Sequence, residues 1–296
     1  MFSHHPNIRK EVREHVLSVA QQYGYRPRLS GKQKNIVIIV PYKQVYPVAE
    51  FVDMVTSELI QKLSLSRYRI ELLPLDNLDR LSEISFCGAV GIGIDVPEKW
   101  DEKFAIPLVI IDKIPAKKIP GVTFVHSDEQ QGMDLAVSHL AERGCKKIGV
   151  FIHGAPGKGN VEIRINAVKA ALTARGLPAD PSLVRAVLAE NFLEEIGKML
   201  QAGIDGLFCC GGANFGGIAA YSLALFGKKI PQDIRVISSE RHRISRYCIP
   251  SQTTISPDYT LMAETVVRQL ERMIKENISS AEEEILPYSL IVRDST

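Results

Sequence analysis

Ile36-Val37-Ile38-Ile39-Val40 is an unbroken run of β-branched residues that ends at Pro41. A strand with one face in water alternates apolar and polar residues, so a run without alternation predicts a strand buried on both faces. Such strands belong to parallel sheets, in which successive strands are joined by helical crossovers. This stretch therefore predicts an α/β fold in which strands and helices alternate along the chain.

The alternation of strands and helices runs twice along the chain, on either side of about residue 145. The elements expected in the first half are helices at 48–63 and 129–143 and strands at 69–75, 89–94, 108–111 and 123–125. Those expected in the second half are strands at 147–152, 183–188, 206–210 and 234–238, helices at 161–175, 192–201 and 215–226, a long helix at 258–277 and a final strand at 285–292. Two such runs predict two similar lobes, each a parallel sheet flanked by helices.

The chain length of 296 residues suffices for two domains, and the 45% hydrophobic and 24% charged content is ordinary for a globular protein. We assign residues 1–35 to an N-terminal helix and linker, and residues 36–296 to a body of two lobes. The expected lobe boundaries are about 36–145 with 256–277 for the first lobe and 146–255 with 278–296 for the second.

Residues 8–23 have the pattern of a charged amphipathic helix, and Gly24 is well placed to end it. Residues 1–34 hold seven basic side chains and two acidic ones, although the whole chain has a net charge of only +2. A basic arm on a mildly acidic body is typical of a segment that contacts phosphates. A solvated surface helix has the same charge pattern, so charge alone leaves both interpretations open.

The five cysteines are scattered and odd in number, which favours reduced thiols over a disulfide framework. Histidines and cysteines with zinc-ligand spacing do not occur, so we expect neither a metal site nor a cofactor. The N-terminus lacks the apolar core of a signal peptide, and no apolar run is long enough to cross a membrane. We therefore expect the protein in the cytoplasm, without a membrane partner.

Catalysis is the weaker expectation for this chain. The sequence has no G-x-S-x-G nucleophile elbow, no H-E-x-x-H zinc motif and no C-x-x-C redox motif. Residues 154–159 superficially suggest a phosphate loop but lack the closing G-K-[ST]. We therefore predict no catalytic residue and do not expect an enzyme.

Widely spaced motifs, from Gly24-Tyr25-Arg26-Pro27 near the N-terminus to Pro250-Ser251-Gln252-Thr253-Thr254-Ile255 near the C-terminus, together resemble those of the LacI/GalR family of transcriptional regulators. The passage that ends in Gly24-Tyr25-Arg26-Pro27 resembles the last helix of that family's DNA-binding headpiece. The body carries the resemblance at 106–112 (I-P-V-V-x-x-D), 125–132 (V-x-x-D-x-x-x-G), 136–148 (A-x-x-H-L-x-x-x-G-H-x-x-I), 164–177, 230–237 and 250–255 (P-x-L-T-T-[VI]). Several such motifs in one order are more specific than any one of them alone.

The resemblance implies a periplasmic-binding-protein-like sensor body that binds a small, sugar-like effector in the cleft between its lobes. It also implies a homodimer, and operator DNA as a partner if a full headpiece is present. Residues 1–24 are too few for a helix-turn-helix, so residues 1–35 resemble only a remnant of the headpiece. The family's DNA contacts from this region would fall on Arg26, Arg28 and Leu29. The alternative is a solute- or sugar-binding sensor that does not bind DNA.

Polar residues at four motif positions are candidates for effector binding. Arg164 follows the strand at 147–152, and its guanidinium offers a rigid fork of donors to a pair of hydroxyls or to a carboxylate. Glu240 stands where the family has the first aspartate of a G-[FY]-D-D motif. Asp112 and Asp128 match family positions too, but an aspartate at a strand end is as often a turn or cap residue. We expect Arg164→Ala to abolish effector binding and to leave folding intact.

Aromatic residues after the first strand are further candidates for the effector site. Tyr42, Tyr46 and Phe51 suit stacking on the apolar face of a sugar, and Tyr247 is placed on the opposite loop. Packing in the core is the alternative for these side chains.

The segment after the strand at 206–210 departs from the family pattern. The family's A-N-D motif is replaced there by Gly211 and Gly212, and Asn214 is the nearest asparagine. We include Asn214 among the candidates and expect an effector pose that differs from the family's usual one.

Overall fold

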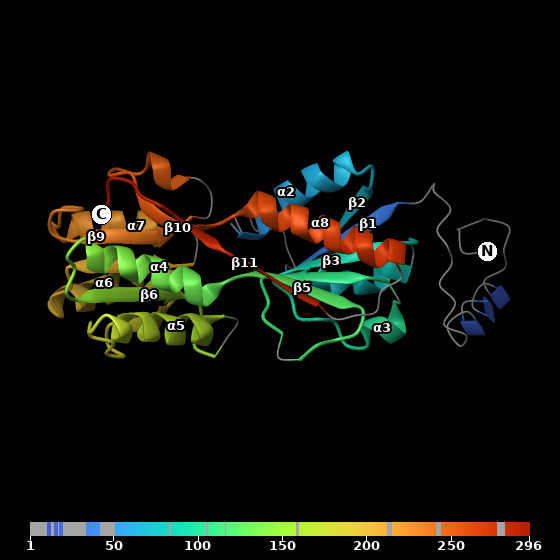
Figure 1. The fold of residues 1–296 in the computed structure, drawn as a ribbon, viewed down its shortest axis with the longest axis horizontal. Coiled ribbons are helices and arrows are strands. Elements are labelled where there is room, and N and C mark those ends of the chain that lie inside the picture. The colour runs from blue at the N-terminus through green and yellow to red at the C-terminus, as the bar shows by residue number, and fades with distance from the viewer. Residues whose placement is uncertain are drawn as a thin grey trace. The chain divides into compact units, whose positions relative to one another are not determined.

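The computed structural model describes residues 34–41, 51–82, 84–104, 106–115, 117–157, 160–211, 215–240, 244–276 and 282–296, together with 11–12, 15–16 and 18–19. These residues form two compact α/β units (Figure 1). The first unit comprises Met1–Tyr46, Val55–Val125 and Ala263–Glu284, and the second comprises Pro47–Met54, His126–Met262 and Ile285–Thr296. The predicted α/β fold with two sheets is confirmed.

The first unit is built on a six-stranded sheet with the order β11-β5-β4-β3-β1-β2. Its strands are β1 (Asn35–Val40), β2 (Arg69–Pro74), β3 (Gly88–Ile92), β4 (Leu108–Ile111), β5 (Val122–Ser127) and β11 (Glu282–Leu286). β1 pairs in parallel with β2 and β3, and β4 pairs in parallel with β3 and β5. The run from Ile36 to Val40 is buried throughout, as its unbroken apolar composition predicts.

Helical segments cover the sheet of the first unit. They are α2 (Phe51–Leu65), α3 (Trp100–Lys103), α8 (Tyr259–Glu276) and the 3-10 segment η1 (Leu75–Ser82). Val37 and Ile39 of β1 share a core with Trp100 of α3. The backbone of β3 lies close to α8, because a Cβ at Gly88 would stand 2.8 Å from Cδ1 of Leu270. η1 contains one non-helical residue, Asn77, so the crossover that leads to β3 is short and irregular.

The second unit is built on a sheet with the order β12-β10-β9-β8-β6-β7. Its strands are β6 (Ile148–His153), β7 (Val184–Val187), β8 (Gly206–Cys210), β9 (Arg235–Ser239), β10 (Thr253–Pro257) and β12 (Tyr288–Ile291). The pairs β6–β7, β6–β8, β8–β9 and β9–β10 are parallel, whereas β12 runs antiparallel to β10. The carboxyl ends of β6 to β10 therefore meet at one edge of the sheet.

Helices lie on both faces of the second sheet (Figure 1). They are α4 (Glu129–Glu142), α5 (Val161–Ala174), α6 (Phe192–Gln201) and α7 (Phe215–Leu225), with 3-10 turns η2 (Ala189–Asn191) and η3 (Ile244–Tyr247). α4 and α5 lie side by side and share a core with Val150 and Ile152 of β6. α6 and α7 share a separate core with Phe151. Successive residues of β6 thus enter opposite layers, as the two-residue period of a strand requires.

The boundaries of the units differ from the lobe boundaries expected from the sequence. We expect the first lobe to continue to about residue 145, whereas the chain leaves the first unit after Val125 and enters the second at His126. The reason is that α4 packs with α5 against the second sheet. The sequence also predicts that residues 256–277 belong to the first lobe. In the structure the corresponding segment of the first unit is Ala263–Glu284.

The C-terminal segment also differs from the sequence prediction. Residues 285–292 are predicted as one strand, but β11 ends at Leu286 in the first sheet and β12 begins at Tyr288 in the second. β10 overlaps the motif at 250–255, but the sequence pattern does not predict a strand there. Most of the helix predicted at 8–23 lies outside the described residues, and residues 11–12, 15–16 and 18–19 are helical.

Gly216 in α7 occupies a site with no space for a side chain, because an added Cβ would stand 2.7 Å from Cβ of Ser238 and closer still to Oε1 of Gln252. Its carbonyl accepts a hydrogen bond from Nε2 of Gln252 at 2.5 Å. We expect Gly216→Ala to lower the free energy of unfolding by about 1–3 kcal/mol, measured by urea denaturation. Gly197→Ala in α6 is the control, since its Cβ would meet Phe226 at an ordinary 3.4 Å. Equal stability of the two variants would contradict the argument.

Candidate functional site

Three polar side chains converge at the edge of the second sheet where its parallel strands end. Arg164 lies in the first turn of α5, the helix that follows β6, and Glu129 is the first residue of α4. Tyr288 pairs with Pro257, the last residue of β10. Ligands of parallel α/β sheets bind beyond the carboxyl ends of the strands, so this edge is the candidate ligand-binding site.

Arg164 and Glu129 form a buried two-pronged ion pair. Nε of Arg164 donates to Oε2 of Glu129 at 2.8 Å, and Nη2 donates to Oε1 at 2.6 Å. The Arg164 side chain is 10% exposed and that of Glu129 is 3% exposed. Burial alone would lower the pKa of Arg164, but the facing carboxylate reverses this effect and holds the pKa well above its ordinary value. The guanidinium therefore stays charged, and its charge is balanced within the unit.

Tyr288 completes the surroundings of the Glu129 carboxylate. Its hydroxyl donates to Oε1 of Glu129 across 3.5 Å. Gln131 holds the Tyr288 backbone on both sides, accepting from its N–H at 2.8 Å and donating to its carbonyl at 3.0 Å. The ring lies against α4 at Gly132, where a Cβ would stand 2.5 Å from Cδ2 of the ring. This contact gives a physical reason for the glycine of the motif at 125–132.

Asp128 has a structural partner in the helix that it precedes. Its side chain accepts a hydrogen bond from the backbone N–H of Gln131 at 3.0 Å and caps the N-terminus of α4. This capping role is the alternative to effector binding that the sequence leaves open for Asp128. Together with Glu129 it places two carboxylates at the positive end of the helix dipole.

Glu240 follows β9 at the same edge and forms a second buried ion pair. Its Oε2 accepts from Nη2 of Arg293 at 2.9 Å and from Oγ1 of Thr254 at 3.0 Å. The side chain is 5% exposed, and among the described residues its Oε1 has no hydrogen-bond partner. The hydroxyl of Tyr259 donates to the backbone carbonyl of Glu240 at 2.8 Å and fixes the chain at this point.

The remaining candidates in the described residues are spread over both units. Asp112 belongs to the first unit, directly follows β4 and has a left-handed backbone with φ of +61°. Phe51 is buried at the start of α2, with its ring 5.9 Å from that of Tyr259, so it has the packing contacts of a core residue. Tyr247 is 75% exposed on η3, and the guanidinium of Arg246 lies over its ring. Tyr42, Tyr46, Asn214, Arg26, Arg28 and Leu29 lie outside the described residues.

The sequence predicts Arg164 and Glu240 as candidates for effector binding but does not predict the side chains with which they pair. Glu129 had a usable signal, since it directly follows Asp128 in the motif at 125–132 and occupies the first turn of a helix that packs on a buried core. Arg293 lies 53 residues after Glu240, and no local pattern marks it as the partner of that carboxylate.

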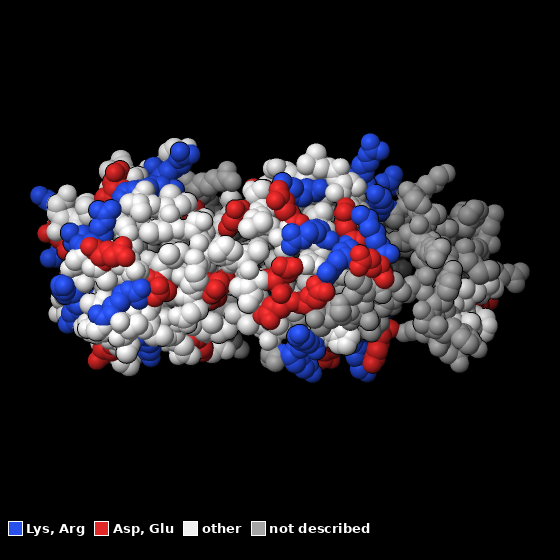
Figure 2. Space-filling view, in the orientation of Figure 1, with Lys and Arg blue, Asp and Glu red and all other residues white. Residues whose placement is uncertain are grey.

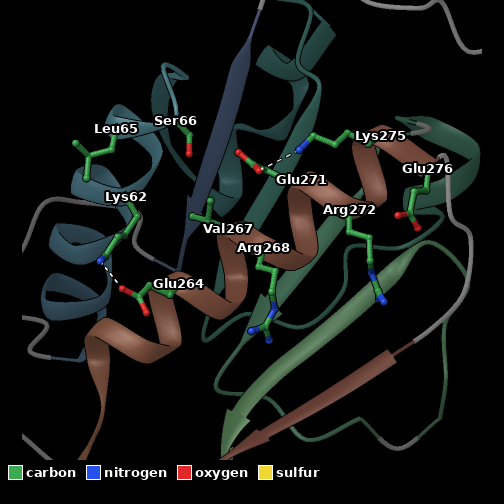
Figure 3. A pocket seen from close by; sticks show the side chains of 10 residues that line it. All are labelled: Lys62, Leu65, Ser66, Glu264, Val267, Arg268, Glu271, Arg272, Lys275 and Glu276. Carbon is green, nitrogen blue, oxygen red and sulfur yellow. Dashed lines mark hydrogen bonds and ion pairs between the residues drawn. The ribbon is translucent and has the colours of Figure 1, made fainter.

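A groove of about 500 Å³ lies in the first unit between α2 and α8 (Figure 3). Four of its charged side chains form ion pairs with one another, Lys62 with Glu264 at 2.5 Å and Lys275 with Glu271 at 3.5 Å. Basic and acidic residues are interspersed over this part of the surface (Figure 2). The groove thus presents exposed ion pairs rather than the converging buried polar groups typical of a ligand site.

The described residues contain no cluster of three or more side chains suited to hold a metal ion. None of the five cysteines forms a disulfide, and burial raises the pKa of Cys87 and Cys145 to about 11, which makes these two thiols poor nucleophiles at neutral pH. In the same part of the chain, none of the helices has the length and apolar composition needed to cross a membrane.

Comparison with known proteins finds related sequences over most of the chain. A family model described as periplasmic binding protein-like domain matches residues 137–296. The ribose operon repressor of Halalkalibacterium halodurans is 28% identical over 209 residues, which cover 68% of this chain and 60% of that protein. The HTH-type transcriptional repressor CytR of Escherichia coli (strain K12) is 24% identical over 320 residues, covering 98% of this chain and 89% of that protein.

Solved structures share the fold. A LacI family transcriptional regulator from Enterococcus faecium, solved with bound ribose, superimposes with a TM-score of 0.75 at 21% sequence identity. The match covers 89% of this chain and 98% of that one. At this identity the likeness establishes the architecture of the two units.

Proposed function

Because the chain belongs to the family of periplasmic binding protein-like domains, we propose that it is the effector-binding sensor of a LacI/GalR-type transcriptional regulator. The observation that carries this proposal is the set of buried, fixed polar groups at the carboxyl edge of the second sheet, with Arg164 and Glu240 at motif positions. The relatives are named as repressors, which favours regulation over catalysis.

The effector of this sensor is a small, sugar-like molecule. Two relatives of known structure carry ribose and D-xylulofuranose, and a third carries lactose. Arg164 and Glu240 supply a donor and an acceptor, the pair of functions that sugar hydroxyls require. Asp112, Tyr42, Tyr46, Asn214 and Tyr247 are further candidates for contact with it.

The regulator acts as a cytoplasmic homodimer in this proposal. Operator DNA is its second partner when a complete headpiece is present, with Arg26, Arg28 and Leu29 in the segment that approaches the DNA. Residues 1–35 supply the end of that headpiece and the linker, and residues 36–296 supply the sensor body. The alternative, a sugar sensor without DNA binding, is distinguished by testing whether a chain with a headpiece retards operator fragments.

A thermal-unfolding screen tests the proposed function. The purified chain is heated with and without ribose, xylulose, cellobiose and lactose. A ligand at about a hundredfold its Kd stabilises by about 2.7 kcal/mol, so a binding sugar is expected to raise Tm by about 5 °C or more. Bovine serum albumin under the same conditions controls for a general solvent effect. Stabilisation by none of the sugars would contradict the proposal.

A further inference from the structure

The ion pair between Arg164 and Glu129 bears on the charge of the effector, and this inference rests on the proposed function. We infer that the site accepts an uncharged, hydroxyl-rich ligand and rejects its anionic counterparts, with Glu129 as the residue that sets this preference. The inference starts from the geometry of the pair, whose two hydrogen bonds are 2.6 and 2.8 Å long.

One edge of the Arg164 guanidinium is committed to Glu129. The fork uses Nε and Nη2, the edge with which an arginine would otherwise grip a carboxylate or phosphate. The donors that remain on the terminal nitrogens suit a hydroxyl group, which needs one hydrogen bond and brings no charge. Arg164 therefore acts toward a ligand as a positioned donor.

The pairing of charges at this edge of the second sheet also favours an uncharged ligand. Arg164 is matched by Glu129 and Glu240 is matched by Arg293, and all four side chains are largely buried, with exposed fractions from 3% to 17%. A carboxylate or phosphate on the ligand would bring an unmatched negative charge close to Glu129, where little water is present to screen it. An uncharged ligand avoids this repulsion.

Glu240 adds an independent requirement on the ligand. Its Oε1 is buried and accepts no hydrogen bond from the described residues. A carboxylate oxygen can only accept, so it is satisfied by a donor such as a sugar hydroxyl. A phosphate dianion or carboxylate has no proton to donate there. Both buried carboxylates thus favour the same class of ligand.

The first test measures whether Glu129 blocks an anion site on Arg164. The probe is inorganic phosphate, added to the wild-type chain and to Glu129→Gln, in which the amide keeps the size of the carboxylate but not its charge. We expect Glu129→Gln to bind phosphate at least about tenfold more tightly than the wild type. The matched control is Asp134→Asn. This change removes the half-exposed carboxylate that pairs with Arg175 at 2.7 Å, and it should leave phosphate affinity nearly unchanged. Equal phosphate affinity in Glu129→Gln and wild type would overturn the inference.

The second test uses the wild-type chain and so does not depend on the folding of a variant. Matched ligands are compared by calorimetry: D-ribose with D-ribose 5-phosphate, and D-glucose with D-glucuronate. The uncharged member of a pair is expected to bind at least about tenfold more tightly. Tighter or equal binding of the anionic member would overturn this inference while supporting the proposed function. Failure of every member of both pairs to bind would count against the proposed function, and this inference would fall with it.

Discussion

Glu129→Ala is expected to lower the free energy of unfolding by about 3–5 kcal/mol, because it leaves the buried guanidinium of Arg164 without a partner. Two charge-assisted hydrogen bonds disappear, and the positive charge remains in a site with little access to water. Urea denaturation of wild type and variant at pH 7 measures the effect. The same reasoning applies to Arg164→Ala, which leaves Glu129 unpaired. The sequence-based expectation that Arg164→Ala spares folding therefore needs revision.

Two controls test whether the loss of stability comes from the buried ion pair or would follow from any substitution in α4 or α5. Asp134→Ala breaks the ion pair between α4 and Arg175, the residue that directly follows α5, but Asp134 is 46% exposed, so a loss of less than about 1 kcal/mol is expected. The double variant Glu129→Leu with Arg164→Met removes both charges and is expected to fold with nearly wild-type stability. If Glu129→Ala were no less stable than Asp134→Ala, the pair would not be buried in solution.

Arg293→Ala is expected to lower the free energy of unfolding by about 3 kcal/mol, because Glu240 then stays buried without its counter-charge. Arg293 also donates to the carbonyl of Gln252 at 2.5 Å and to the hydroxyl of Thr254 at 3.2 Å, and these bonds are lost as well. Chemical denaturation at pH 7 provides the measurement.

Arg268→Ala is the matched control for this variant. Arg268 faces Glu284 across 3.6 Å and is 62% exposed, so its removal should change stability by less than about 1 kcal/mol. A loss of stability in Arg293→Ala no larger than that in Arg268→Ala would argue against an unpaired buried carboxylate as its cause.

Much of the fold could be predicted from local patterns. Runs such as Ile36–Val40 are buried on both faces and contain no polar residue, so their place in a parallel sheet follows from composition. The helix at 192–201 and the strand at 206–210 were predicted with the bounds that the structure has. The division at residues 285–292 was not predicted, because the change from one sheet to the other depends on which strand each half pairs with.

The candidate site was predictable only in part, for a physical reason. Arg164 and Glu240 stand in motifs, but what each side chain contacts is decided by residues distant in the sequence. Glu129 lies 35 positions before Arg164, and Arg293 lies 53 positions after Glu240. Pairings of this kind depend on the packing of helices and strands against one another, which a local pattern does not encode.

Calorimetric titration of a stabilising sugar into wild type and Arg164→Lys tests the central claim most directly. Lysine keeps the positive charge beside Glu129 but lacks the further guanidinium donors that would bond the sugar, so we expect affinity to fall by about tenfold or more. Arg175→Lys, which alters the more exposed ion pair that Asp134 of α4 forms with the residue after α5, should bind the sugar as the wild type does. Unchanged affinity in Arg164→Lys would contradict an effector site at the carboxyl edge of the second sheet.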